Sequence, residues 1–568
     1  MILDMIKKSL VLAGCLFVTL SAMAQVNNRK GVEDVNKVVD NTFDSLKIAQ
    51  TARPVPGSSR RGNNPVLFLI GNSTMRNGTL GNGNNGQWGW GYFAYQYFDE
   101  NKITVENQAL GGMSSRTFYN NLWEPIRQAL KPGDWVIVSI GHNDNGPYDS
   151  GRARASIPGV GNDTLNVTIK ETGKQETVYT YGGYMRKYID DIRAAGAYPI
   201  LMSLTPRDAY DEKGKIVRKP HTQWLMQVAA EEGVPFVDLN EISGQKLDGF
   251  SKWKEKYHFF GDHIHTSKFG AEMNARSAAE GLWNSRNPML KPLQAMMKNI
   301  ELPRHEVDRS DGKPVVWITG DSTVKNKDKE KDDMWGWGAV AYDVFDQKKI
   351  TVMNVAQAGR SCRSYLAEGR WDRVYNSLQP GDYVLIEFGH NDIGEIDKPK
   401  FRGAIASAKD TCHVYKMTDK SVKNNGNVVD KTLPVTAGIR PGDYVVVYSF
   451  GWYLKKFIDD VREKGATPIL VSLTPRNEWP GGKIERRNDS YGKWYREVVE
   501  ETGVEFVDLH NITADFLDKK CGSKEKASKY FKHDHTHTSL LGAKTNAKSV
   551  AKGLRDINSK LAGYLKGK

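Results

Sequence analysis

Four short motifs that hold polar side chains or glycine recur in the same order in both halves of this 568-residue sequence. They are Gly-Asn/Asp-Ser-Thr, a glycine-rich stretch, Gly-His-Asn-Asp and Asp-x-x-His. A glycine N–H and a side-chain amide can donate to an oxyanion, and a carboxylate three residues before a histidine can fix the tautomer of its ring. Each motif alone is a common turn, but their ordered recurrence indicates two copies of one reactive site. The residues are Ser73, Gly112, Asn143, Asp262 and His265, then Ser322, Gly359, Asn391, Asp534 and His537.

Longer stretches around these motifs are repeated too, so the chain is a duplication of a whole domain. Order is kept throughout, and the second copy carries additional residues between 393 and 447. The matching pairs include "WGWG" at 88–91 and 335–338, "KPGDWVIVSIGHND" (131–144) with "QPGDYVLIEFGHND" (379–392), and "YPILMSLTPRD" (198–208) with "TPILVSLTPRN" (467–477).

The elements that position the motifs follow from short apolar runs that alternate with amphipathic segments. "YMRKYIDDIRAAG" and "YLKKFIDDVREKG" have helical periodicity and end in glycine. Buried strands joined by helical crossovers predict a five-stranded parallel sheet, covered on both faces, in each copy. Ligands bind beyond the carboxyl ends of such strands, where the motifs converge. The predicted strands are 66–70, 103–107, 135–140, 199–204 and 234–238, then 315–319, 350–354, 383–388, 468–473 and 504–508.

The motif set resembles the SGNH (GDSL-type) hydrolase superfamily. The sequences "GDST", "GHND" and "DHTHTS", with "GRARASIPGVGND" at 151–163 and "WGWG", are most similar to its rhamnogalacturonan acetylesterase branch. The resemblance covers both domains and implies a flavodoxin-like three-layer α/β/α fold for each. It implies Ser73 and Ser322 as nucleophiles, His265 and His537 as general bases, and Asp262 and Asp534 as the carboxylates that orient the bases. It implies oxyanion holes built by Gly112 with Asn143 and by Gly359 with Asn391.

This resemblance predicts an esterase that removes acetyl groups from plant polysaccharide, most similar to those acting on rhamnogalacturonan or pectin, through an acyl-enzyme and without metal or cofactor. Acetylated xylan is an alternative substrate. The formal net charge of +13 suits an acidic polysaccharide. Nucleic acid is not expected, because no dense Lys/Arg stripe occurs. Candidate substrate-binding residues are Trp88, Trp90, Trp335 and Trp337, which could stack on sugars, and Arg360, which could contact a uronate.

The sequence divides into segments with distinct composition. Lys7 and Lys8 before an apolar run, and Ala22-Met23-Ala24, predict a signal peptide and a secreted or periplasmic protein without a transmembrane anchor. A lipoprotein attached through Cys15 is the alternative. Only three cysteines remain after cleavage, all in the second half, so no disulfide framework is expected. The predicted segments are a signal peptide (1–24), a polar segment and linker (25–62), a first domain (63–290), a connector (291–314) and a second domain (315–568).

Two other functions fit parts of the sequence. His533, Asp534, His535 and His537 form a cluster that could bind a metal, with His142 or His390 as further ligands. However, the first copy has Gly261 where the second has His533. Alternatively, one copy could be a non-catalytic glycan-binding module, and the first is then the candidate.

The first copy departs from the family pattern beside its serine, where Asn72 replaces the aspartate found at Asp321. It also has Met113 where the second copy has Arg360. Asparagine keeps the size and an acceptor oxygen of aspartate, so it can hold the same turn. We therefore expect Ser73 to be active. The second copy departs at "KFRGAIASAKD" and in its longer insertion, where Lys431 and Arg440 add positive charge.

Overall fold

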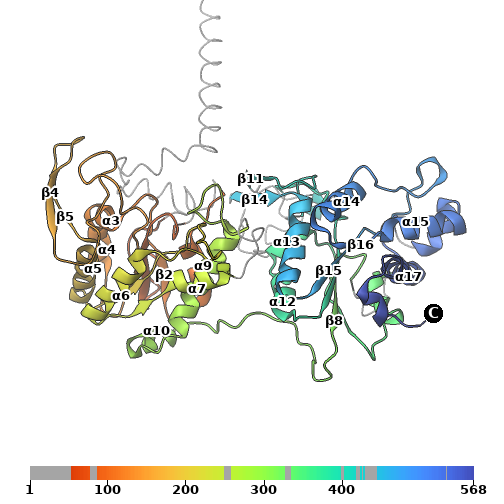
Figure 1. Ribbon diagram of the computed structural model, residues 1–568, viewed down its shortest axis with the longest axis horizontal. Coiled ribbons are helices and arrows are strands. Elements are labelled where there is room, and N and C mark those ends of the chain that lie inside the picture. Colours follow the sequence, from red (N-terminus) through yellow and green to blue (C-terminus); the bar gives the residue numbers. More distant parts are fainter. Residues whose placement is uncertain are drawn as a thin grey trace, which may run out of the picture. The chain divides into compact units, whose positions relative to one another are not determined.

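The computed structural model describes residues 53–76, 86–248, 257–325, 334–397, 402–416, 423–424, 427–428, 444–531 and 534–567. Contacts divide the chain into two units, Met1–Glu301 and Leu302–Lys568. Figure 1 shows that each unit has its own sheet with helices packed around it. The predicted signal peptide with Cys15, and also Lys431, Arg440 and His533, lie outside the described residues.

The sheet of the first unit is five-stranded and entirely parallel, in the order β2-β1-β3-β6-β7. This is the order of flavodoxin-like folds, in which the first strand lies inside the sheet. All six residues of β1 are buried, as are all five of β3, because helices cover both faces. The strands are β1 (Val66–Gly71), β2 (Thr104–Asn107), β3 (Trp135–Ser139), β6 (Tyr198–Met202) and β7 (Phe236–Val237).

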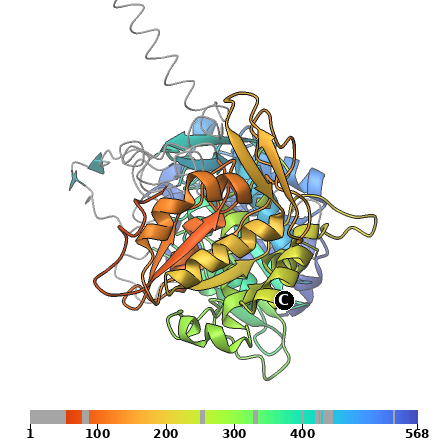
Figure 2. The same cartoon turned by 90° about the vertical axis from the view of Figure 1, so that its left-hand side faces the viewer.

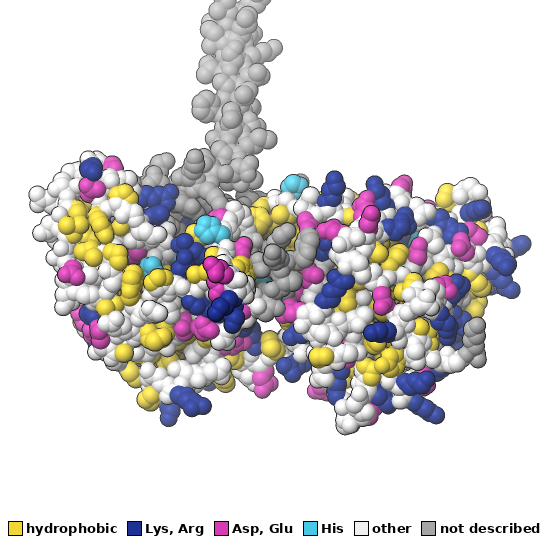
Figure 3. Space-filling view, in the orientation of Figure 1, with side chains coloured by type: hydrophobic (Ala, Val, Ile, Leu, Met, Phe, Trp, Pro, Cys, Tyr) yellow, Lys and Arg dark blue, Asp and Glu magenta, His cyan; other side chains and the backbone are white. Residues whose placement is uncertain are grey.

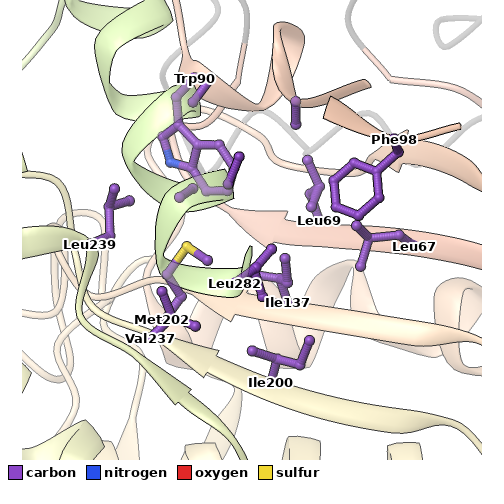
Figure 4. Packing of buried hydrophobic residues seen from close by; sticks show 14 of the residues in the cluster. Leu67, Leu69, Trp90, Phe98, Ile137, Ile200, Met202, Val237, Leu239 and Leu282 are labelled. Carbon is purple, nitrogen blue, oxygen red and sulfur yellow. The ribbon is translucent and has the colours of Figure 1, made fainter. Parts of the chain in front are cut away.

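Two apolar clusters, one on each face, hold the first sheet between its helices. Strand residues Val66, Phe68 and Val136 pack with one group of helices, and Leu67, Leu69 and Ile137 with the other. Figure 4 shows the second cluster, where Trp90 and Leu282 approach the strands. The first group is α3 (Ser115–Asn121), α4 (Trp123–Ala129), α5 (Tyr181–Ala194) and α6 (Pro220–Glu232). The second is η2 (Trp90–Tyr92), η3 (Ala94–Tyr97), α7 (Leu239–Asp248), α9 (Lys268–Trp283), η4 (Pro288–Leu290) and α10 (Lys291–Gln294).

The second unit repeats this architecture, with the strand order β16-β15-β10-β8-β9 and parallel pairing throughout. The strands are β8 (Val315–Gly320), β9 (Thr351–Asn354), β10 (Tyr383–Glu387), β15 (Thr467–Val471) and β16 (Glu505–Val507). The helices are η5 (Trp337–Asp343), α11 (Cys362–Ala367), α12 (Arg370–Ser377), α13 (Phe450–Glu463), η7 (Pro480–Gly482), α14 (Tyr491–Thr502), α15 (Leu509–Lys520), α16 (Lys524–Ala527), η8 (Ser528–Tyr530), α17 (Leu540–Asp556) and η9 (Lys560–Tyr564).

The predicted fold class, two tandem α/β/α domains with five-stranded parallel sheets, is confirmed. Each predicted strand is present and differs from the observed one by only a few residues at its ends. The two segments with helical periodicity lie in α5 and α13. Among the described residues, no helix combines the length and apolar character that crossing a membrane requires. Cys362, Cys412 and Cys521 are free thiols.

A β-hairpin that the sequence patterns did not predict lies beside the sheet in each unit. In the first unit β4 (Thr164–Thr168) pairs with β5 (Gln175–Tyr179), and this hairpin projects from the body of the unit (Figures 1 and 2). In the second, β11 (Cys412–Lys416) pairs with β14 (Tyr444–Tyr448), and β12 (Lys423–Asn424) pairs with β13 (Asn427–Val428). The alternating Thr, Val and Tyr around "ETGK" were a readable signal for the first hairpin.

Residues of the predicted linker and of the predicted connector pack against the domains. Arg60, in the predicted linker, forms two hydrogen bonds of 2.8 and 2.7 Å with the buried Asp134 carboxylate. Leu293, in the predicted connector, is fully buried in the first core. Arg309, near the connector's other end, binds the equivalent Asp382 with two bonds of 2.7 Å. Both buried carboxylates also accept backbone N–H bonds, from Val66 and Val315 at the starts of β1 and β8.

Candidate active site

Both serines lie in a tight turn directly after the first strand of their sheet. In the second copy, Asp321 Oδ1 accepts bonds from the N–H and the hydroxyl of Thr323, both at 2.8 Å. In the first copy, Asn72 Oδ1 accepts the same pair of bonds from Thr74, at 3.1 and 3.0 Å. Asn72 therefore holds the turn as Asp321 does, because one acceptor oxygen is enough for both bonds.

Each histidine lies between its serine and its aspartate. His265 Nε2 is 2.7 Å from Ser73 Oγ, and its Nδ1 is 2.7 Å from Asp262 Oδ2. In the second copy, His537 Nε2 is 2.9 Å from Ser322 Oγ, and its Nδ1 is 2.6 Å from Asp534 Oδ2. The same geometry of hydroxyl, imidazole and carboxylate is thus present in both units.

The aspartates are held ionised by the loop that carries them. Asp262 Oδ1 accepts the backbone N–H groups of Ile264 and His265, at 2.9 and 2.8 Å. Burial alone would raise the pKa of Asp262, but the bonds from the His265 ring and from these N–H groups outweigh it and hold the pKa well below its usual range. The pKa of Asp534 is lowered for the same reasons. A carboxylate that stays ionised fixes the proton on Nδ1 and leaves Nε2 to accept a proton.

The WGWG segment connects the serine turn to the histidine loop in both copies. In the first, Trp90 N–H donates to Thr74 O at 3.1 Å, and Trp88 N–H donates to Thr266 O at 2.9 Å. In the second, Trp337 and Trp335 make the equivalent bonds, at 3.0 and 2.8 Å. The chains approach so closely that a Cβ on Gly89 would lie 1.7 Å from a carbonyl oxygen, so glycine is required there.

The prediction that these tryptophans stack on sugar is wrong for three of them. Trp88, Trp90 and Trp337 are 5%, 1% and 0% exposed, so none presents a ring face to a ligand. They pack in the core because the WGWG segment lies between the serine turn and the histidine loop and forms hydrogen bonds to both. Trp335 is partly buried against the second core, and its role in substrate binding stays a prediction.

In each copy the predicted asparagine donor contacts the residue that follows the predicted glycine donor. Gly112 and Gly359 adopt φ values of 77° and 73°, which a side chain would strain. The Asn143 amide donates to Met113 O at 3.0 Å, and the Asn391 amide to Arg360 O at 3.3 Å. Each amide therefore lies near its glycine, and the oxyanion hole that the two would form stays a prediction.

His142 and His390, considered above as metal ligands, have roles inside the fold. Their Nε2 atoms are 3.1 Å from the hydroxyls of Thr205 and Thr474. Burial holds the pKa of each ring well below its usual range, with Arg207 and Arg476 adding to the effect. His533, on which the metal alternative also depended, lies outside the described residues.

A family model named GDSL-like lipase/acylhydrolase matches residues 69–273 and 318–544, which together make up most of the chain. The chain belongs to the GDSL-like lipase/acylhydrolase family. The resemblance on which the sequence analysis relied is therefore confirmed, and both copies are acylhydrolase domains.

Named relatives of this acylhydrolase match about one copy each. A rhamnogalacturonan acetylesterase of Emericella nidulans is 28% identical over 260 residues, which are 45% of this chain and 91% of that protein. The rhamnogalacturonan acetylesterase RhgT of Bacillus subtilis is 29% identical over 269 residues, 44% of this chain and 95% of that protein. Among solved structures, an acetylxylan esterase from Geobacillus stearothermophilus aligns with 16% identity and a TM-score of 0.28, covering 45% of this chain and 97% of that chain.

Two arginines that the sequence analysis did not single out border the acylhydrolase sites. Arg154 Nη1 donates to Gly112 O at 3.2 Å. In the second copy, Arg402 Nη2 would lie 2.3 Å from a Cβ on Gly359. The two arginines are equivalent, because Ser156 and Ala404, each two residues later, make the same backbone bond to Asp144 and Asp392. Aligning the two copies between 151 and 163 of the first and "KFRGAIASAKD" of the second would have matched Arg154 with Arg402 from the sequence alone.

Arg360, the predicted contact for a uronate, is engaged with an acidic residue of its own unit. Its Nε lies 3.0 Å from both carboxylate oxygens of Glu368. Glu368 therefore neutralises much of the positive charge with which Arg360 was expected to bind a uronate. The role of Arg360 in substrate binding stays a prediction.

Proposed function

We propose that the chain is a carbohydrate acetylesterase with two serine active sites, which removes acetyl groups from acetylated plant polysaccharide. The observation that carries the proposal is the Ser–His–Asp geometry, which occurs twice with Nε2–Oγ distances of 2.7 and 2.9 Å. Two named relatives that match a single copy are rhamnogalacturonan acetylesterases, and they favour rhamnogalacturonan as the substrate.

In the proposed mechanism, Nε2 of the histidine takes the serine proton and the alkoxide attacks the acetyl carbonyl. The serine N–H, the glycine N–H and the asparagine amide hold the oxyanion. The histidine returns the proton to the sugar oxygen, and the sugar leaves. Water, activated by the same histidine, then releases acetate from the acyl-serine. The residues are Ser73, Asp262, His265, Gly112 and Asn143, and Ser322, Asp534, His537, Gly359 and Asn391.

The proposal is tested by acetate release from acetylated rhamnogalacturonan oligosaccharides, with acetylated xylo-oligosaccharides compared at equal acetyl concentration. We expect the larger kcat/KM on the rhamnogalacturonan fragments, and no release from fragments that were chemically deacetylated. A larger kcat/KM on the xylan fragments would contradict the proposed substrate. Failure to release acetate from either would contradict the esterase function.

Surface charge is consistent with a polysaccharide substrate. On the face shown in Figure 3, Lys and Arg side chains alternate with Asp and Glu in both units. That face offers no continuous basic stripe of the kind that follows a nucleic acid backbone.

We also propose that the chain is exported and cleaved after Ala24, on the evidence of the basic and apolar segments before that position. The mature N-terminus of the exported protein is then expected to be Gln25, as read by N-terminal sequencing. A lipid-modified N-terminus at Cys15 would instead establish the lipoprotein alternative.

A further inference from the structure

Glu387, the last residue of β10, is buried directly behind the serine turn of the second copy. Its exposed fraction is 1%, and its carboxyl contacts three donors or hydroxyls. Oε2 accepts the Trp337 indole N–H at 2.5 Å, and Oε1 lies 3.0 Å from Thr323 Oγ and 3.2 Å from the Thr474 N–H. The mechanism proposed above does not use this acid.

The contacts of Thr323 require that one neighbouring carboxyl carries a proton. Its hydroxyl lies 2.8 Å from Asp321 Oδ1 and 3.0 Å from Glu387 Oε1. A hydroxyl has one hydrogen, so it can donate to only one of two carboxylates. The second contact is favourable only if the other carboxyl itself donates to the threonine oxygen.

The proton belongs on Glu387. Burial raises the pKa of Asp321 too, but Asp321 accepts the Thr323 N–H at 2.8 Å and the Asn391 amide at 3.2 Å, and these bonds and the His537 ring oppose the rise. Burial, followed by the charge of Asp321, raises the pKa of Glu387 to about 8. At neutral pH the hydrogen bonds therefore run from Glu387 to Thr323 and from Thr323 to Asp321.

We propose that Glu387 is a positioning residue of the second active site: its carboxyl hydrogen orients the Thr323 hydroxyl toward Asp321, and Asp321 in turn orients the Asn391 amide that serves the oxyanion hole. The hydrogen-bond chain thus runs from the indole of Trp337 to the oxyanion donor. The other hydrogen of the Asn391 amide contacts Arg360 O at 3.3 Å, and this longer contact is the one that the oxyanion replaces. This inference rests on the esterase function proposed above for the second copy, and assigns that site a proton that it must retain.

The first copy has neither of the two carboxyl groups, Glu387 and Asp321, that form this hydrogen-bond chain in the second copy. By strand register, Gly320 pairs with Glu387 and Gly71 pairs with Ser139, so Ser139 occupies the place of Glu387. Ser139 donates to Ser203 O at 3.1 Å, and Asn72 replaces Asp321. The two substitutions remove both carboxyls together. The first site therefore has no group here that titrates near pH 8.

Among the described residues, several charged and titratable groups surround the hydrogen-bond chain of Glu387, Thr323 and Asp321. Tyr495 and Asp321 interact electrostatically with Glu387. Asp321 interacts in addition with His537, Cys362, Asp392, Arg402 and Arg476. Loss of the Glu387 proton adds a second negative charge beside Asp321 and leaves one hydrogen between two anions. The added negative charge disfavours the oxyanion, and the Asn391 amide is no longer held in one orientation. Activity therefore falls as the pH rises through the pKa of Glu387.

The experiment uses the full chain with one serine removed, so that each site is measured alone. In the Ser73→Ala chain, kcat/KM for acetate release is expected to fall by up to about tenfold for each pH unit above the midpoint. Adding Glu387→Gln, which keeps a donor toward Thr323 and an acceptor for Trp337, loses only the acceptor for the Thr474 N–H at 3.2 Å and cannot ionise, removes this fall. Glu387→Leu, which lacks both groups, lowers kcat more than KM changes. The Ser322→Ala chain, measuring the first site, is the matched control and shows no such fall.

A second readout does not depend on activity. In [15N]tryptophan-labelled Ser73→Ala chain, one indole N–H resonance is expected to shift with a midpoint near pH 8, and to stop titrating in Glu387→Gln. An unchanged alkaline fall in Glu387→Gln, or no indole resonance that depends on Glu387, would overturn the inference. If the Ser73→Ala chain releases no acetate at any pH, the proposed function of the second copy fails, while the resonance still tests the hydrogen-bond chain.

Discussion

Replacing both Ser73 and Ser322 by alanine is expected to lower kcat for acetate release by about 10⁴–10⁶-fold, the range expected when a nucleophile is removed from a site of this kind. The reason is that each hydroxyl lies 2.7 or 2.9 Å from its histidine, which takes the proton and so creates the nucleophile that attacks the acetyl carbonyl. Acetate release under saturating acetylated oligosaccharide, with thermal unfolding to confirm the fold, measures the effect.

The matched control removes two exposed hydroxyls, one in each unit, by Ser58→Ala with Ser310→Ala. These serines precede β1 and β8, whereas the nucleophiles follow those strands, so the control is expected to retain the kcat of the parent. A double active-site variant that kept even a tenth of the parent activity would exclude the serine mechanism.

The two single variants divide the activity between the copies. Because Asn72 holds its turn through the same two bonds as Asp321, we expect the Ser322→Ala chain to remain active through Ser73. A Ser322→Ala chain that is as inactive as the double variant on every acetylated glycan tested would instead support a binding role for the first copy.

Asp262→Asn, measured in the Ser322→Ala chain, is expected to lower kcat by about 10⁴-fold. The side-chain oxygen of asparagine would keep the bonds from the Ile264 and His265 N–H groups, at 2.9 and 2.8 Å. Its amide would then donate to Nδ1 of His265, which would place the ring proton on Nε2. A protonated Nε2 cannot accept the serine proton, although the geometry is kept. Asp534→Asn in the Ser73→Ala chain is expected to show the same loss.

The neighbouring Asp208 provides a matched control for this charge removal. Its backbone N–H, not its carboxylate, donates to His263 O at 2.8 Å, and the second copy has Asn477 with the equivalent bond at 2.7 Å. Asp208→Asn is therefore expected to keep kcat within about threefold, since asparagine already occupies the equivalent position in the second copy. Equal losses in Asp208→Asn and Asp262→Asn would show that general electrostatics, rather than the tautomer of His265, is responsible.

The sequence by itself determined the duplicated architecture and the candidate reactive residues. Runs such as Val66–Gly71 are apolar throughout because both faces of a parallel strand are buried, so their position can be read from local composition. The order of serine, glycine, asparagine and Asp-x-x-His was readable because each motif immediately follows a strand or starts a helix. Helix α9, for example, begins after Ser267, two residues beyond His265.

Only the tertiary structure decided what surrounds these residues. WGWG has the composition of a sugar-binding surface, but three of the four tryptophans in its two copies are buried, because the segment forms hydrogen bonds to two loops that are distant in sequence. Arg60 and Arg309 lie in polar stretches typical of linkers, but they bind buried carboxylates that lie directly before β3 and β10. In the sequence, Glu387 is simply the last residue of an apolar strand. Its protonation state depends on Thr323 and Asp321, which follow a different strand and lie beside it only in the folded domain. Local composition predicts which residues form an element, whereas burial and charge depend on long-range contacts that no local pattern contains.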